Sequence, residues 1–254
     1  MLKLLPYRDL AWELVRRDLR VRYRRSFLGL AWSMLQPLLM MIVLHLAFSS
    51  LFRFDIDNYP VYALAGILFW NFFSQSIVHS MNALKGNSTL IQRLPVPKAV
   101  FPVSAIASGV VNLALAILPL LALLVVTGHP LRPALLFLPV SVLIAAIFTL
   151  GAGLLLSPLA VFFNDVVELV GVFLQLAMYL TPIFYPMKIL PPNVLPIVRF
   201  NPLRSVLEVF RDPIYYGKVP PLSHLAVATG LALLLLVIGA WVFSKSSKRV
   251  NFYL

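Results

Sequence analysis

Long hydrophobic segments alternate with short polar segments along the whole chain. Six of the hydrophobic segments carry almost no charge and are apolar on every side of a helix: residues 29–51, 59–78, 100–126, 133–156, 166–184 and 222–243. Crossing the hydrocarbon core of a bilayer takes about 20 residues of α-helix, and each segment has roughly that length. The pattern therefore predicts an all-α integral membrane protein with six transmembrane helices.

A different pattern precedes the first hydrophobic segment. Over residues 6–25, charged side chains fall on one face of a helix and apolar side chains on the other. The charged face includes Arg16, Arg17 and Arg20. We interpret this stretch as an amphipathic helix lying in the membrane interface. It either only anchors the chain through its cations, or it also offers its charged face to a cytosolic partner.

Composition supports the membrane interpretation. The chain has 254 residues, of which 61% are hydrophobic and 12% charged, whereas soluble proteins are about 25% charged. Little length is left for a soluble catalytic domain, so we expect one transmembrane domain over 1–254. It would comprise an interface helix in 1–28, the bundle in 29–243 and a tail in 244–254. The net charge of +12 suits anionic lipid better than nucleic acid, because the basic residues flank apolar spans.

Basic residues also predict the orientation. Six arginines stand between residues 16 and 25, and such clusters stay on the cytoplasmic side. With an even number of spans, both termini would then be cytoplasmic. The loop between the fifth and sixth spans is an exception, because it keeps cations outside. Arg199, Arg204 and Arg211 would there contact an anionic group, or form ordinary salt bridges with Glu208 and Asp212.

That outer loop is also expected to contain short helices. Asn201 and Pro202 form a good helix start, since Asn caps a first turn and Pro is tolerated there. Apolar residues then recur at helical spacing up to Phe210. The resulting helix is too short to span, and we expect it to rest on the outer membrane surface.

The loop after the second span contains a candidate contact for a partner. Its residues predict a short helix on the cytoplasmic face, which Pro95 and Pro97 end. Such a helix between two spans can fit a groove on another protein and pass a rigid-body movement to both spans. A plain tight loop is the simpler alternative. The candidate coupling residues are Asn87, Ser88, Leu90, Ile91, Gln92 and Arg93.

Aromatic side chains gather in the first, second and fifth spans. Their flat apolar faces can stack on sugars, although packing and interfacial belts explain single aromatic residues equally simply. The candidates for a glycan-conducting channel are Trp32, Phe69, Trp70, Phe73 and Tyr179.

Catalytic and nucleotide-binding motifs are missing from the sequence. It has no Cys, no His-Glu-x-x-His, no Gly-x-Ser-x-Gly and no phosphate-binding Gly-x-x-x-x-Gly-Lys-Ser/Thr loop. We therefore predict no catalytic residue, no metal site and no cofactor in this chain. His45 is the deepest ionisable residue, and either bonds a backbone carbonyl or serves transport. Asp165 and Glu168 are the nearest approach to an acidic site.

Four blocks in order resemble one known family. They are RVRYRRSFLGLAWSMLQPLL at 20–39, the spacing of Asn87, Leu90, Ile91, Pro97 and Pro102, LQLAMYLTPIFYP at 174–186, and NPLRSVLEVFRDPIYYG at 201–217. Together they are similar to the ABC-2 type permeases that export polysaccharides. One departure is Asn164, where that family usually has Arg.

The resemblance implies the permease subunit of an ATP-driven exporter in the bacterial inner membrane. It implies a homodimer, and two copies of a separate ATPase subunit that holds ATP and Mg. The loop after the second span and the N-terminal helix would receive the ATPase movement. The implied substrate is a lipid-linked polysaccharide of the O-antigen or teichoic acid kind. Two alternatives are a membrane-embedded enzyme acting on lipid-linked sugars or phospholipid, and an ABC-2 exporter of small lipids or drugs.

Overall fold

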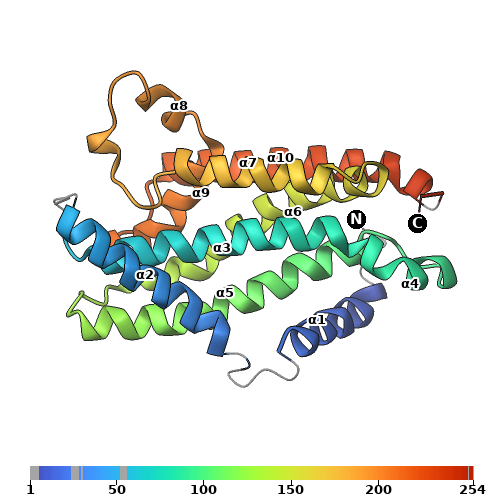
Figure 1. The fold of residues 1–254 in the computed structure, drawn as a ribbon, viewed down its shortest axis with the longest axis horizontal. Helices are drawn as coiled ribbons and strands as arrows, with labels where there is room; N and C mark the ends of the chain where they lie inside the picture. The colour runs from blue at the N-terminus through green and yellow to red at the C-terminus, as the bar shows by residue number, and fades with distance from the viewer. Residues whose placement is uncertain (1–5, 24–28, 30, 52–55, 251, 254) are drawn as a thin grey trace.

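In the computed structural model, every regular element of the described chain is a helix, as the hydrophobic pattern predicts (Figure 1). The structure describes residues 6–23, 29, 31–51, 56–250 and 252–253. The α-helices are α1 (Arg8–Tyr23), α2 (Ala31–Leu51), α3 (Tyr59–Ala83), α4 (Ser88–Arg93), α5 (Val100–Val126), α6 (Leu138–Phe162), α7 (Val166–Leu180), α8 (Leu195–Arg199), α9 (Pro202–Arg211) and α10 (Leu222–Val250). Short 3-10 turns occupy Lys85–Asn87, Pro133–Phe137 and Met187–Ile189, and a π-helical turn occupies Asp212–Tyr216.

Within the described residues, four helices are long and apolar enough to cross a membrane: Tyr59–Ala83, Val100–Val126, Pro133–Phe162 and Leu222–Ser247. They begin at the residues predicted for the second, third, fourth and sixth spans. The other two predicted spans contain shorter apolar helices, Met34–Val43 within α2 and the 15-residue α7. α7 stops at Leu180 because Thr181 takes an extended conformation ahead of Pro182, as residues before proline commonly do. The structure thus confirms an all-α membrane fold.

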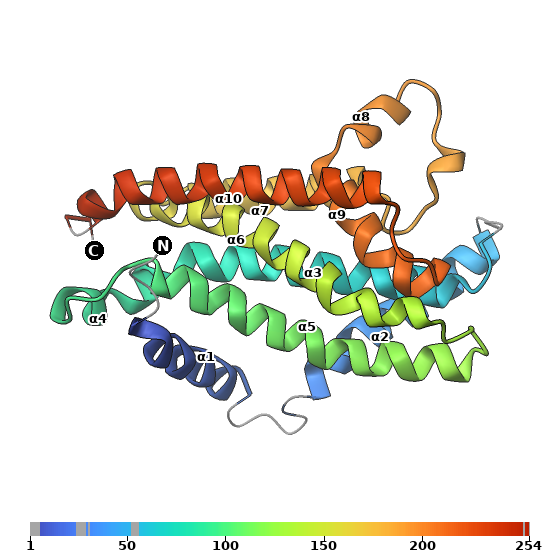
Figure 2. The ribbon, with the colours of Figure 1, turned by 180° about the vertical axis from the view of Figure 1, so that it is seen from behind.

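Helix α3 is the central element of the bundle. Of the four apolar segments long enough to cross a membrane, the segment in α3 is the most buried. α5 and α6 pack along it, and α10 packs along α6 (Figures 1 and 2). Small residues bring these helices close: Gly109 of α5 lies against Ser76, and Gly153 of α6 lies against Ser80. Membrane helices associate through such small residues because lipid supplies no hydrophobic drive between them.

The two ends of the bundle differ. α4 and both chain termini lie at one end, hereafter the α4 end, and α8 lies at the other, the α8 end (Figures 1 and 2). At the α4 end, α1 packs against the bundle through Leu14, which joins a buried cluster with Ile91 and Phe101. The outer face of α1 exposes Trp12 and Val21. The expected amphipathic helix therefore has one face buried on the bundle.

Helix α9 begins as the sequence predicts. The Asn201 side chain accepts a hydrogen bond from the Leu203 backbone N–H at 3.0 Å, and Pro202 occupies the first turn. Its apolar residues, including Val206, Leu207 and Phe210, are fully buried against α3, α6 and α10. The expectation that this helix rests on a membrane surface therefore differs from the structure, which places it inside the bundle.

Candidate functional site

A stripe of polar residues, three amides and one histidine, runs along α3. Asn71, Gln75, His79 and Asn82 are spaced by four, four and three residues, so the helical repeat places them on one face. All four are at least partly exposed, while the rest of α3 is largely buried and apolar. The prediction that this segment is apolar on all sides is therefore wrong for this face.

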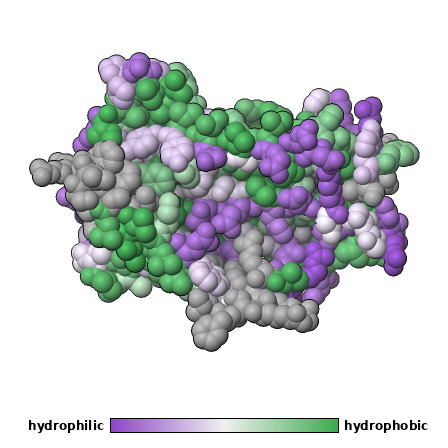
Figure 3. Space-filling model, in the orientation of Figure 1, coloured by the Kyte–Doolittle hydropathy of each residue, from purple (hydrophilic) through white to green (hydrophobic). Residues whose placement is uncertain are grey.

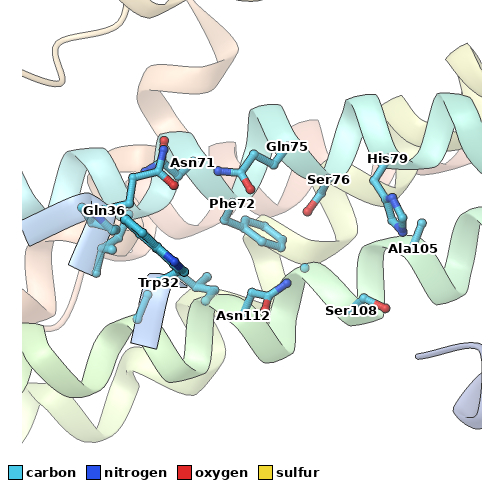
Figure 4. Close-up of a pocket in the computed structure, with 15 residues that line it drawn as sticks. Trp32, Gln36, Asn71, Phe72, Gln75, Ser76, His79, Ala105, Ser108 and Asn112 are labelled. Atoms are coloured by element: carbon cyan, nitrogen blue, oxygen red, sulfur yellow. The ribbon is translucent and has the colours of Figure 1, made fainter. Parts of the chain in front are cut away.

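Neighbouring helices turn the stripe into a groove. A hollow of 340 Å³ lies between α2, α3 and α5, where Trp32, Gln36 and Asn112 join the α3 residues (Figure 4). A second hollow of 360 Å³ shares Gln36 and Asn71 with the first and reaches α7. A third of 580 Å³ shares Gln75 and continues along α7 to Gln175. We call these three adjoining hollows together the α3 groove. Its polar lining residues are Gln36, Asn71, Gln75, His79, Asn82, Asn112 and Gln175.

The α3 groove sets a row of polar side chains, most of them amides, between largely apolar walls. None of the described residues lining its three hollows is Asp, Glu, Lys or Arg. Figure 3 shows hydrophilic residues along the middle of this face, at the level of α3, with hydrophobic surface over α7 and over α2 beside them. The side-chain amides of Gln36, Asn71, Gln75 and Gln175 make no hydrogen bond to other described residues. Each amide can both donate and accept hydrogen bonds.

A hydrogen-bond network closes the groove at the α4 end. His79 Nε2 lies 3.1 Å from Asp18 Oδ2 of α1. Arg17 donates to the other Asp18 oxygen at 2.9 Å and to Asn87 Oδ1 at 2.7 Å. Burial alone would raise the pKa of the Asp18 carboxyl, but hydrogen bonds from His79 and Arg17 outweigh it, so the pKa lies below its ordinary value. The network joins α1, α3 and the start of α4.

The candidate coupling residues divide into buried and exposed sets. Ile91 is 7% exposed and packs in the cluster with Leu14, and Asn87 is buried in the network just described. Gln92 and Arg93 are exposed, and so is Leu94, at 46%. The remaining candidates are Ser88 and Leu90, which are half-buried, and Arg16 and Arg20, which are exposed. The exposed residues at the end of α4 are thus 92–94.

Three of the five candidate channel aromatics are core residues of this chain. Phe69, Trp70 and Phe73 are buried, and the Trp70 and Phe73 ring centroids lie 5.9 Å apart. Trp32 and Tyr179 are 48% and 61% exposed. Trp32 borders the α3 groove. Stacking on sugar is a prediction that the fold leaves open for these two exposed rings.

The three outer arginines occupy different environments at the α8 end. Arg204 Nε donates to Glu208 Oε1 at 2.7 Å, the ordinary salt bridge foreseen from the sequence. Arg199 is exposed and lines a 510 Å³ hollow with Arg204 and His224.

Arg211 differs from the exposed position that we expected for it. It is only 3% exposed and donates to the carbonyls of Pro182 and Ile183 at 2.8 and 3.0 Å. Its guanidinium also sits 3.9 Å above the ring of Tyr62. The side chain therefore fastens the end of α9 to the chain that follows α7.

The remaining sequence candidates contribute no cluster. Asp165 and Glu168 are exposed at the α6–α7 turn. In the described part of the chain, no three His, Cys, Asp or Glu side chains lie close enough to hold a metal ion. Asn164 accepts a hydrogen bond from Lys85 at 2.8 Å. The His45 side chain lies outside the described residues.

Sequence reasoning missed the α3 groove, although its signal was available. Polar residues at positions 71, 75, 79 and 82 recur with the period of a helix inside an otherwise apolar span. A search for charged or aromatic residues overlooks amides, whose grouping on one face becomes visible only when the segment is placed on a helical wheel.

An all-helical domain whose described residues include four helices long and apolar enough to cross a membrane is typical of integral membrane proteins. The sequence profile of the ABC-2 type transporter family matches residues 9–215. The chain therefore belongs to the ABC-2 type transporter family, and the resemblance seen in its four sequence blocks is confirmed. Members of this family are membrane subunits of transporters, which agrees with a transport role.

Several relatives match nearly end to end. The O-antigen export system permease protein RfbA of Myxococcus xanthus is 31% identical over 98% of this chain and 96% of its own length. A protein of the same name from Klebsiella pneumoniae is 28% identical over 95% and 93%. The capsule polysaccharide export inner-membrane protein CtrC of Neisseria meningitidis serogroup B is 26% identical over 94% and 91%.

Proposed function

We propose that this chain is the permease subunit of an ATP-driven exporter that moves a lipid-linked polysaccharide across the bacterial inner membrane. The observation that carries the proposal is the near full-length similarity to permeases named for O-antigen and capsule polysaccharide export. The polymer would be O-antigen-like or teichoic-acid-like. The α3 groove agrees with this role, because a row of polar side chains along a membrane helix can contact a hydrophilic cargo.

The proposed assembly is a homodimer with two copies of a separate ATPase subunit that binds ATP and Mg. In it α2 and α7 cross the membrane with the four long helices, giving six spans and cytoplasmic termini. Two features support this arrangement. The N- and C-termini lie together at the α4 end (Figure 1), and α7 exposes an apolar face that includes Val172, Phe173 and Leu176. A second copy or lipid would cover such a face.

The ATPase subunit would dock at the α4 end. Gln92, Arg93 and Leu94 are exposed on α4 and at its end, and Arg16 and Arg20 are exposed on α1. At the α8 end, the exposed Arg199 would contact the anionic head of the lipid carrier, whereas Arg204 is paired with Glu208. Trp32 and Trp70, which line hollows of the α3 groove, and the exposed Tyr179 remain the candidates for stacking on sugar.

Deleting the chain from its native bacterium and complementing it tests the proposal. Surface polysaccharide, measured on a gel with a glycan stain, should disappear on deletion and return with the complementing copy. The tagged chain, purified in a gentle detergent, should bring a P-loop ATPase with it. Unchanged surface polysaccharide together with a homomer free of ATPase would overturn the proposal and return attention to a membrane-embedded enzyme.

A further inference from the structure

We infer that the α3 groove binds the neutral sugar units of the exported polymer through a ladder of side-chain amides, rather than binding the anionic lipid carrier. The inference rests on the proposed function and adds to it a ligand chemistry and a set of residues. Gln36, Asn71, Gln75 and Gln175 are the central amides, and Asn112 and His79 flank them.

The amides show that the groove faces water or a polar ligand. Leaving an amide without a hydrogen bond in an apolar medium costs about 2–7 kcal/mol. Gln36, Asn71, Gln75 and Gln175 find no partner among the described residues of the chain. Because these four amides lie on one face, covering that face with lipid would incur this free-energy cost once for each amide. Water and a hydrogen-bonding cargo are therefore the occupants that stabilise the groove.

The absence of charge in the lining selects the kind of cargo. An anionic carrier is held by cations, yet none of the described residues that line the groove is Lys or Arg. A sugar hydroxyl both donates and accepts a hydrogen bond, and so does a side-chain amide. Uncharged polyols therefore match the groove, while Arg199 and Arg204 lie apart from it in their own hollow at the α8 end.

The spacing of the amides suits a polymer that must move. Asn71 and Gln75 are one helical turn apart, about 6 Å, and the stripe from Asn71 to Asn82 extends for about 16 Å. A row of similar and individually weak sites lets a cargo exchange one contact for the next, since conduction requires binding that is favourable but easily released. Successive sugar units would advance along the stripe in this way.

Cysteine labelling gives a direct test, because the chain has no native Cys. A Gln75→Cys variant is treated with a water-soluble maleimide in native membranes, in cells that accumulate polymer because the ATPase is inactive and in cells that make no polymer. Val237→Cys on α10 is the control, since Val237 is 66% exposed and lies outside the groove. We expect the Gln75→Cys variant to react, and to react several-fold more slowly when polymer is present.

Each other outcome overturns the inference. A Gln75→Cys variant that is unreactive without polymer means that the groove is closed to water. Equal labelling with and without polymer means that sugar does not occupy the groove, and a disulfide-linked dimer means that a second copy does.

Export measurements add a second test. Asn71→Leu and Gln75→Leu should each lower surface polysaccharide about 2- to 10-fold, the range expected for one hydrogen bond. Gln75→Asn should retain most export, because it keeps an amide. Normal export by both Leu variants overturns the groove assignment, whereas unchanged polysaccharide after deletion of the whole chain overturns the proposed function itself.

Discussion

His79 of α3 and Asp18 of α1 lie 3.1 Å apart and connect the α3 groove to α1. Arg17 extends the contact to Asn87 at the start of α4. A displacement of α4 by a docked partner would therefore reach the groove through hydrogen bonds, in addition to the covalent link through the end of α3.

The first prediction concerns this network. Asp18→Asn removes the negative charge that both Arg17 and His79 contact, and should loosen the docking of α1 by about 1.5–3 kcal/mol, the range for hydrogen bonds to charged groups. Export should fall several-fold while the ATPase subunit still co-purifies. The measurement is surface polysaccharide per copy of assembled complex. The exposed Asp9→Asn variant on the same helix is the control, and equal export by both variants would contradict the prediction.

A second prediction separates the two faces of α4. Leu94→Asp should weaken capture of the ATPase subunit in pulldowns without lowering the melting temperature, because Leu94 is exposed. Ile91→Asp should instead destabilise the chain by about 2–4 kcal/mol, since it places a carboxylate in a buried cluster. Fluorescence-detected size exclusion after heating measures the stability. Equal ATPase capture by wild type and Leu94→Asp would remove 92–94 from the docking surface.

A third prediction concerns Arg211. Arg211→Ala should destabilise the chain by about 3 kcal/mol, because two backbone carbonyls lose a charged donor. Gly66→Ala should have a similar effect, since a Cβ there would lie 2.5 Å from Arg211 Nη2. Arg199→Ala, at an exposed site, should leave the melting temperature unchanged. Normal stability of Arg211→Ala combined with lost export would instead assign Arg211 to the anionic cargo.

The sequence predicts helix positions well where the apolar pattern is continuous. The second, third, fourth and sixth predicted spans all begin at the observed residue, because polar loops bound them sharply. The burial of α9 was not predictable, since an amphipathic helix of 10 residues can place its apolar face on lipid or on protein. The helical pattern alone does not distinguish these two environments.

The candidate site was predictable only in part for a similar reason. Residue type indicated that Arg211, Trp70 and Ile91 could serve function, yet tertiary packing buries all three. Their partners, among them Pro182, Phe73 and Leu14, come from distant segments. The α3 stripe, by contrast, is a local pattern and needed only the helical period.

The last prediction concerns pH and Asp212, which follows α9 at the α8 end. Burial, assisted by the nearby Glu208 carboxylate, raises the pKa of Asp212 from 3.8 to about 6, although His224, Arg211 and Lys218 act in the opposite direction. A raised folded-state pKa means that protonation stabilises the fold. This contribution is fully present below pH 3.8 and is lost as the pH rises through about 6.

Melting curves between pH 5 and 8 test this assignment. The wild type should lose stability across that range relative to Asp212→Asn, which cannot ionise and should be the more stable of the two at pH 8. Asp165→Asn, at an exposed turn, should follow the wild-type pH profile. If Asp212→Asn also follows the wild-type pH profile, water hydrates the Asp212 carboxyl when the protein is in the membrane. The turn after α9 is then more open to water than its packing indicates.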